Sequence, residues 1–140
     1  MTDAEIEYLA RNLKPIVDPR FVFFAFVDGT PAGLFIALPD YNQVLRKIKG
    51  RLFPLGIVRF LVEKRRIDRL RVLVLGVRTE FRGLGIEALF LEEVFRRGME
   101  LGYQGAEMSW VLEDNAAMNR IIARLVPDPY RIYRVYGTSL

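Results

Sequence analysis

The residues best suited to chemistry lie in a glycine-containing turn near the middle of the chain. An apolar segment, residues 73–77, leads through polar residues into Arg82-Gly83-Leu84-Gly85, and an amphipathic stretch follows. Glycine has no Cβ, so backbone N–H groups can approach an anion closely. The N-terminus of a helix adds unpaired N–H donors and the positive end of its dipole. Because Arg82 adds a permanent cation, the turn predicts a cradle for a phosphate or pyrophosphate group.

Other interpretations of the turn are weaker but remain open on the residues alone. Gly83-x-Gly85-x-x-Ala88 has the spacing of a dinucleotide-binding turn, which normally begins at the very end of its strand. Here five residues, 78–82, intervene, and the chain has no second βαβ half. A Walker phosphate loop is excluded, since no Gly-Lys-Ser/Thr follows. The turn could also simply begin a helix.

The turn and its surroundings resemble the acetyl-CoA motif of the GNAT superfamily of N-acyltransferases, which is R/Q-x-x-G-x-G/A after a bulged strand. The match is Arg82-Gly83-Leu84-Gly85-Ile86, with Glu87 at the last position in place of the usual small residue. The segment 107–115, which reads EMSWVLEDN, also resembles an uncharacterised bacterial subgroup of the superfamily. The resemblance covers about residues 20–137.

The resemblance implies an N-acyltransferase that moves an acyl group directly from acetyl-CoA or another acyl-CoA to an amine. The CoA pyrophosphate would lie beside Arg82 and against the N–H groups of Gly83, Leu84, Gly85, Ile86 and Glu87. Backbone groups of Leu75 and Val77 would pair with the pantetheine arm, and Gly76 would mark the strand bulge. Asn115 would contact the CoA arm or cap its helix.

A general base must be a side chain other than His, because the chain has none. Glu107, Glu113 and Asp114 are the candidates, and Glu113 is preferred because it follows a predicted strand at its C-terminal end. Asp114 is interpreted as a helix N-cap. The chain also lacks Cys, so no acyl-enzyme on a thiolate can form.

A general acid is expected among the C-terminal tyrosines. Many GNAT enzymes place a Tyr seven residues after the helix-opening Asn, and this chain has Ile122 there. Tyr133 is the chosen substitute, with Tyr130 and Tyr136 as alternatives. If none serves, the alternative function is a non-catalytic acyl-CoA-binding or interaction module.

Composition narrows the class of protein further. The 140 residues are 51% hydrophobic and 27% charged, which is typical of a folded domain and not of a disordered tail. Without Cys or His, and without EF-hand spacing, no metal is expected. The acidic start lacks a basic and then apolar leader, and the densest apolar run, residues 21–27, is short. A cytoplasmic location is therefore expected.

Periodicity and turn residues predict one α/β domain over residues 1–140, GNAT-like, with a mixed central sheet flanked by helices. Expected helices are 3–13 with Asp3 as N-cap, 41–49, 57–65, 82–101 and 115–125. Expected strands are 21–27, 32–38, 70–77, 105–112 and 130–136, and Asp28-Gly29 predicts a hairpin between the first two. Ile86, Leu89, Phe90, Val94 and Leu101 should form the apolar stripe of the longest helix. Compared with the superfamily, the chain is expected to lack the usual N-terminal strand and helix, either through a truncated start or because it is the C-terminal part of a longer protein.

A helical insert at 39–69 separates the hairpin from the motif strand. Residues 41–71 hold ten basic and two acidic side chains, so they carry +8 while the rest of the chain carries −4. The insert could be a lid, a clamp for an acidic substrate, a membrane-surface helix or a basic outer face. We expect it to form one wall of the acceptor pocket, with Phe53 and Phe60 in that wall. Small-molecule or peptide amines are the expected partners and a homodimer is a further option; nucleic acid is not expected, since no reader motif occurs.

Overall fold

The computed structural model describes residues 2–48, 56–108, 110–126, 128, 131–133 and 137. The chain divides into two compact units, Met1–Ser109 and Trp110–Leu140. Among the described residues, unit 1 holds the sheet and most of the helices, and unit 2 holds the helix over residues 116–125 with its flanking segments. The single domain over residues 1–140 stays a prediction.

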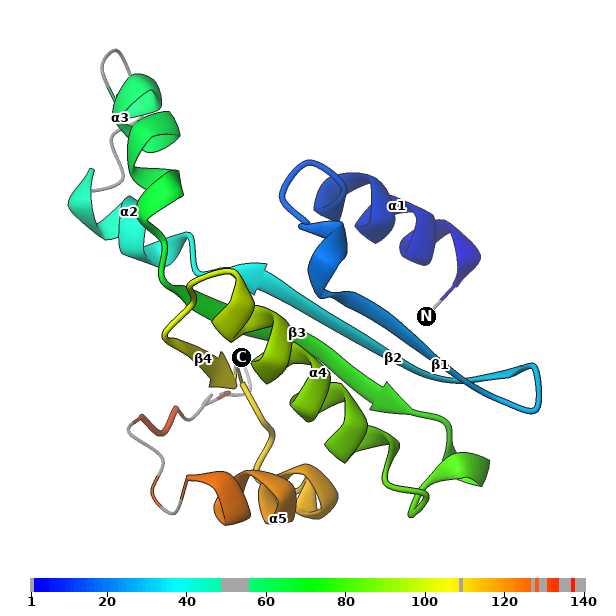
Figure 1. The fold of residues 1–140 in the computed structure, drawn as a ribbon. Coiled ribbons are helices and arrows are strands. Elements are labelled where there is room, and N and C mark those ends of the chain that lie inside the picture. The colour runs from blue at the N-terminus through cyan, green and yellow to red at the C-terminus, as the bar shows by residue number, and fades with distance from the viewer. Residues whose placement is uncertain are drawn as a thin grey trace. The chain divides into compact units, whose positions relative to one another are not determined.

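In the part of the chain that the structure describes, the sheet has four strands in the order β1-β2-β3-β4 (Figure 1). They are β1 (Val22–Val27), β2 (Thr30–Pro39), β3 (Arg69–Val77) and β4 (Gly105–Met108). The first two pairs are antiparallel and the β3–β4 pair is parallel, which confirms the mixed sheet. Asp28 and Gly29 have φ of 48° and 77°, the two positive values that a two-residue hairpin turn requires, so the predicted hairpin is present.

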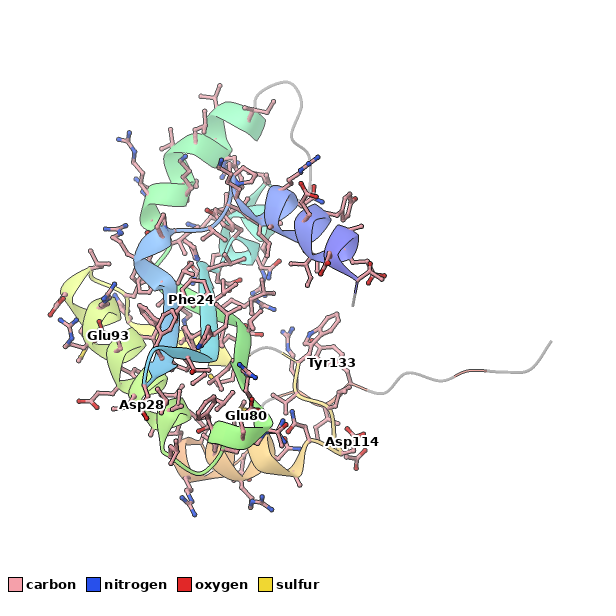
Figure 2. The ribbon with its side chains drawn as sticks, turned by 90° about the vertical axis from the view of Figure 1, so that its right-hand side faces the viewer. Phe24, Asp28, Glu80, Glu93, Asp114 and Tyr133 are labelled. Carbon is pink, nitrogen blue, oxygen red and sulfur yellow. The ribbon has the colours of Figure 1, made fainter. Side chains whose placement is uncertain are left out.

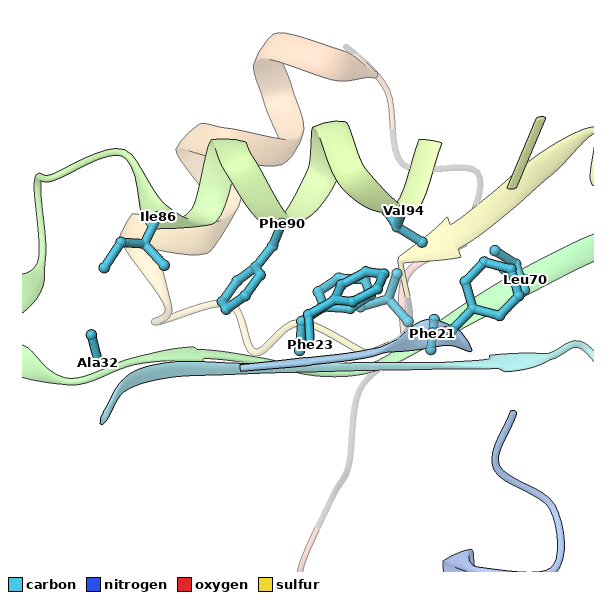
Figure 3. Packing of buried hydrophobic residues seen from close by; sticks show 10 residues of the cluster. Phe21, Phe23, Ala32, Leu70, Ile86, Phe90 and Val94 are labelled. Atoms are coloured by element: carbon cyan, nitrogen blue, oxygen red, sulfur yellow. The ribbon is translucent and has the colours of Figure 1, made fainter. Parts of the chain in front are cut away.

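The long helix α4 (Ile86–Glu100) covers one face of this sheet, and the hydrophobic core lies between them (Figure 3). Phe35 is fully buried at its centre, with its ring 5.4 Å from Phe23 and 5.8 Å from Phe90. The helix begins four residues later than predicted, because Gly83 and Gly85 have left-handed φ angles that a helix cannot contain.

The predicted apolar stripe of α4 is partly wrong. Ile86, Phe90 and Val94 are buried as expected, but Leu89 and Leu101 are 62% and 40% exposed. Leu91 and Gly98 are buried in addition. The buried side of the helix follows Ile86, Phe90, Val94 and Gly98 at intervals of four residues, and Leu89 lies off this line. Gly102, with a φ of 82°, ends the helix as predicted.

The remaining helices are α1 (Asp3–Leu13), α2 (Asn42–Lys47), α3 (Gly56–Glu63) and α5 (Ala116–Leu125), with 3-10 turns η1 (Pro19–Phe21), η2 (Lys64–Arg66) and η3 (Thr79–Phe81). The N-cap of α1 is Thr2, not Asp3. Thr2 Oγ1 accepts a hydrogen bond from the Glu5 N–H, and the Glu5 carboxylate accepts one from the Thr2 N–H. This capping box satisfies two donors, which a cap at Asp3 could not match.

The two strands predicted nearest the C-terminus are partly wrong. The strand expected over 105–112 ends at Met108, and residues 131–133 are not in a strand. Ser109, Tyr130 and residues 134–136, including Tyr136, lie outside the described residues. Among the described residues, the β3–β4 ladder ends with the pair Val72 and Met108, next to the bulge in β3.

The insert lies at the end of the sheet where β2 ends and β3 begins (Figure 1). Val77 lies at the opposite end of β3, eight residues from Arg69, which at 3.3 Å per residue is roughly 26 Å away. The prediction that the insert forms a pocket wall beside Val77 is therefore wrong for the described residues. Phe53, the first residue proposed for that wall, lies outside them.

Candidate acyl-CoA site

The glycine turn forms the N-terminus of α4. Gly83 and Gly85 have φ of 85° and 81°, and Gly85 is the N-cap. The Leu89 N–H donates to the Gly85 carbonyl over 3.1 Å, which is the first turn of the helix. The N–H groups of Ile86 and the next two residues therefore have no acceptor within the helix. An anion placed there would meet these donors and the positive end of the helix dipole.

A strap of polar residues holds the turn against the end of the sheet. Arg78 pairs with Glu80, donates to the Pro31 carbonyl over 3.1 Å and lies 5.9 Å from the centre of the Phe81 ring. Arg82 Nε donates to the Val77 carbonyl over 3.4 Å. The sequence predictions treated residues 78–82 only as an interruption between the strand and the glycine turn, and they missed this strap.

Beside this turn, β3 offers backbone groups at its edge. The Arg78 N–H donates to the Ala32 carbonyl over 2.9 Å, so Arg78 and Ala32 form a hydrogen-bonded pair. Hydrogen-bonded and non-hydrogen-bonded pairs alternate along the antiparallel strands β2 and β3 from there. By that alternation, Leu75 and Val77 lie at non-bonded positions and direct their N–H and C=O groups away from β2. The ladder with β4 covers only Arg69–Val72, so β3 continues five residues beyond it.

The bulge in β3 is at Leu73 and not at Gly76, which corrects the sequence prediction. Ile36 pairs with Val74 and Ala37 with Val72, so Leu73 is the extra residue. Gly76 pairs regularly with Leu34. The bulge adjoins the last β3–β4 pair, so the two parallel strands part where the local twist increases.

Glu87 lies in the first turn of α4 and is half-buried. A carboxylate in that turn is stabilised by the helix dipole. The same carboxylate would repel a phosphate group bound at the turn if it pointed toward it. Leu84, between the two glycines, is 61% exposed.

The other candidate residues belong to unit 2. Asn115, not Asp114, is the N-cap of α5: its side chain accepts from the Met118 N–H over 3.2 Å. Asn119 Nδ2 donates to the carbonyls of Leu112 and Glu113 over 3.0 and 3.2 Å and so fixes the loop that carries Glu113. Sequence reasoning missed this role, although an Asn one turn after an N-cap Asn is a visible signal.

Glu113 has an exposed side chain. Tyr133 is 66% exposed; its hydroxyl accepts from Arg131 Nη1 over 3.4 Å, and its ring lies 6.3 Å from that of Trp110 (Figure 2). The structure thus brings the proposed CoA-binding residues of β3 and α4 together in unit 1, and it places Glu113, Asn115 and Tyr133 in unit 2.

Glu107, the alternative base on β4, is engaged by an arginine. Arg71 Nη2 donates to Glu107 over 2.9 Å, and Arg71 Nε lies 3.4 Å from the Asp40 carboxylate. Asp40 is buried, at 8% exposure. This partly buried cluster ties β3 to β4 and to the end of β2, which suits a structural role.

In the part of the chain that the structure describes, no group of three or more acidic side chains is arranged to hold a metal ion. Over the same residues, every helix is too short or too polar to cross a bilayer.

The fold is that of the GNAT acetyltransferases. AAC(6')-Iy in complex with the bisubstrate analogue CoA-S-monomethyl-acetylneamine matches it with a TM-score of 0.62 at 15% identity, over 99% of this chain and 82% of that chain. Aminoglycoside acetyltransferase meta-AAC0020, from an uncultured soil metagenomic sample and in complex with trehalose, matches with a TM-score of 0.57 at 15% identity, over 100% and 76%. The GNAT-like fold expected from the turn and the order of elements is confirmed.

Two curated sequences are more similar in sequence. Bacterial ceramide synthase of Caulobacter vibrioides (strain NA1000 / CB15N) is 34% identical over an alignment of 145 residues, and Protein YghO of Escherichia coli (strain K12) is 30% identical over the same length. Each alignment covers 99% of this chain but only 38% and 37% of the relative. The chain therefore spans less than two-fifths of the length of these relatives. No family model matches it.

Proposed function

We propose that this chain binds an acyl-CoA at the turn 82–87 and transfers the acyl group to an amine. The observation that carries the proposal is the juxtaposition of the Gly83–Gly85 turn at the start of α4 with the outward-facing backbone of Leu75 and Val77. A pyrophosphate needs N–H donors and positive charge, and the turn with Arg82 supplies both. The amide-containing pantetheine arm needs an extended backbone whose N–H and C=O groups face outward, and Leu75 and Val77 of β3 supply such groups, with the Val77 carbonyl shared with Arg82 Nε.

The proposed reaction is a direct transfer. The amine nitrogen attacks the thioester carbonyl carbon, a C–N bond forms, the C–S bond breaks, and the thiolate of CoA leaves. Glu113 accepts the proton that the amine loses, directly or through a water, and Tyr133 gives one to the leaving sulfur. With no Cys in the chain, the acyl group passes to the acceptor without a covalent thioester intermediate on the protein.

For the acceptor, we propose a long-chain amine. A ceramide is a long-chain amino alcohol acylated on its nitrogen. The relative named bacterial ceramide synthase aligns with 99% of this chain. The matching solved structures support only the fold at 15% identity, so their aminoglycosides do not guide the choice.

Calorimetric titration tests the cradle, with CoA, acetyl-CoA and palmitoyl-CoA as ligands. Arg82→Gln should weaken binding of all three by about tenfold, or about 1.4 kcal/mol, because it removes one charge-assisted contact to phosphate. Arg124→Gln on α5 is the matched control and should leave binding unchanged. Absence of binding by the unaltered chain, or an equal effect of the two variants, would reject the proposal.

A non-catalytic acyl-CoA-binding module is the second candidate. It is favoured by Ile122, which stands where many GNAT enzymes carry the acidic tyrosine, and by the carboxylate of Glu87 beside the cradle. Release of free CoA, measured with palmitoyl-CoA and sphinganine, separates the two. Turnover that is lost in Glu113→Gln supports the transferase, whereas tight binding with no thiol release supports the module.

A further inference from the structure

Helix α3 carries an apolar face that is exposed. Ile57, Val58, Leu61 and Val62 are 52%, 62%, 51% and 55% exposed. Their spacing of one, three and one residues places all four on one side of the helix. Phe60 lies on the other side, where its ring stacks on Tyr41 at 5.9 Å. The helix is therefore apolar on two sides, and only the Phe60 side is packed.

The same region is strongly basic, and most of its charge is unpaired. Glu63 is the single acidic residue among residues 42–48 and 56–66, against six basic ones, which gives a net charge of +5. Lys47 and Arg66 pair with Glu63 at 2.6 and 3.2 Å. Among the described residues, the other exposed cations have no ion pair within 4 Å: these are Arg46, Arg59, Lys64 and Arg65.

Specific contacts fix how α3 presents this face. The hydrogen bond from Lys47 is the main cause that lowers the pKa of Glu63, so the ion pair holds α3 to α2 at neutral pH. Tyr41, which stacks on Phe60, donates its hydroxyl to the Ile16 carbonyl over 3.2 Å. With its other side held in this way, the apolar face of α3 points outward at the edge of unit 1, and the helix projects from the sheet in both views (Figures 1 and 2).

We propose that α3 and its flanking cations dock the chain on an anionic phospholipid surface. Four aliphatic side chains on one side of a helix match the boundary between headgroups and acyl chains. Unpaired Arg and Lys beside them match lipid phosphates, and each cation near such a surface contributes about 1 kcal/mol. A nucleic acid would match the charge but would leave the aliphatic face in water. This docking surface does not depend on the proposed acyltransferase activity.

Co-sedimentation of the full chain with vesicles tests the proposal. Vesicles of phosphatidylglycerol and phosphatidylcholine in equal amounts should bind the chain, and vesicles of phosphatidylcholine alone should bind it at least tenfold more weakly. Binding to the anionic vesicles should also weaken as salt is raised. Failure to bind anionic vesicles, or equal binding to both kinds, would overturn the proposal.

Two variants locate the surface. Ile57→Ser/Leu61→Ser removes half of the apolar face, and Arg59→Gln/Lys64→Gln/Arg65→Gln removes three cations; each should weaken binding to anionic vesicles at least tenfold. The matched control for the first is Ile6→Ser/Leu9→Ser on α1, where the side chains are 48% and 45% exposed. The control for the second is Arg120→Gln/Arg124→Gln on α5.

Circular dichroism shows whether the α3 variants keep the fold. Loss of vesicle binding only in the α3 variants supports the proposal. Equal loss in the controls would show adsorption that does not depend on α3 and would overturn it. Binding of α3 to a nucleic acid in preference to anionic vesicles would overturn it as well.

Discussion

Replacement of Gly85 by alanine should cost stability and acyl-CoA affinity separately. The φ of 81° is a left-handed conformation, in which a residue with a Cβ costs about 1–2 kcal/mol. A Cβ at this position would meet no atom within 4 Å, so the loss of stability should not exceed that strain. The same Cβ would stand where N–H groups must approach a phosphate. Affinity for acyl-CoA should therefore fall at least tenfold, or about 1.4 kcal/mol.

Gly102 provides a matched control at the other end of the same helix. Its φ is 82°, and a Cβ there would also meet nothing within 4 Å. Gly85→Ala and Gly102→Ala should lower the free energy of unfolding by equal amounts in urea titrations. Only Gly85→Ala should weaken binding of acetyl-CoA in calorimetry. If the two folded variants bind acetyl-CoA equally well, Gly85 does not belong to a phosphate cradle.

Three further predictions concern α4 and α5. Glu87→Ala should bind acetyl-CoA as tightly as the unaltered chain or more tightly, because it removes at most a repulsion; clearly weaker binding in calorimetry would show a favourable contact instead. Hydrogen bonds from Arg96, and secondarily from Arg97, lower the pKa of Glu93 (labelled in Figure 2) from its ordinary value of 4.5 to about 2. The ionised Glu93 therefore stabilises the folded state fully above pH 4.5, and this stabilisation is lost as the pH falls from 4.5 toward 2. Glu93→Gln should thus lower the melting temperature at pH 7, with a difference that shrinks over this range; a constant difference would contradict the assignment. Asn115→Ala should destabilise α5 by about 1 kcal/mol and Asp114→Ala by much less, as judged by helical signal in thermal melts.

The elements of unit 1 could be predicted because each has a local signal. Asp28-Gly29 required a two-residue hairpin turn, and the run 70–77 had the apolar character of a buried strand. The glycine turn was visible from residue types alone, because only glycine adopts those φ angles at low cost. The end of α4 was equally clear from Gly102.

The errors arise where residue types alone leave more than one option open. Either Asp114 or Asn115 could cap α5, and the choice depends on the bond from Met118 N–H. The bulge was assigned to Gly76 because glycine is common at bulges, but the register with β2 puts it at Leu73. The position of the insert follows from sheet topology, which its composition does not encode. The proton-transfer roles of Glu113 and Tyr133 stay predictions.

The bulge at Leu73 also means that β3 contains one residue that its sheet pairing does not require. If Leu73 were deleted, Val72 and Val74 would become neighbours and would face Ala37 and Ile36, which are already neighbours on β2. Both halves of the ladder would keep their partners, and the pleat would become continuous. The core contacts of Val72 and of Leu75 would survive. The shortened strand would lose the local twist at the point where β3 leaves β4. Deletion of Leu73 should therefore change the shape of the edge of β3 while leaving the pairing of the sheet intact.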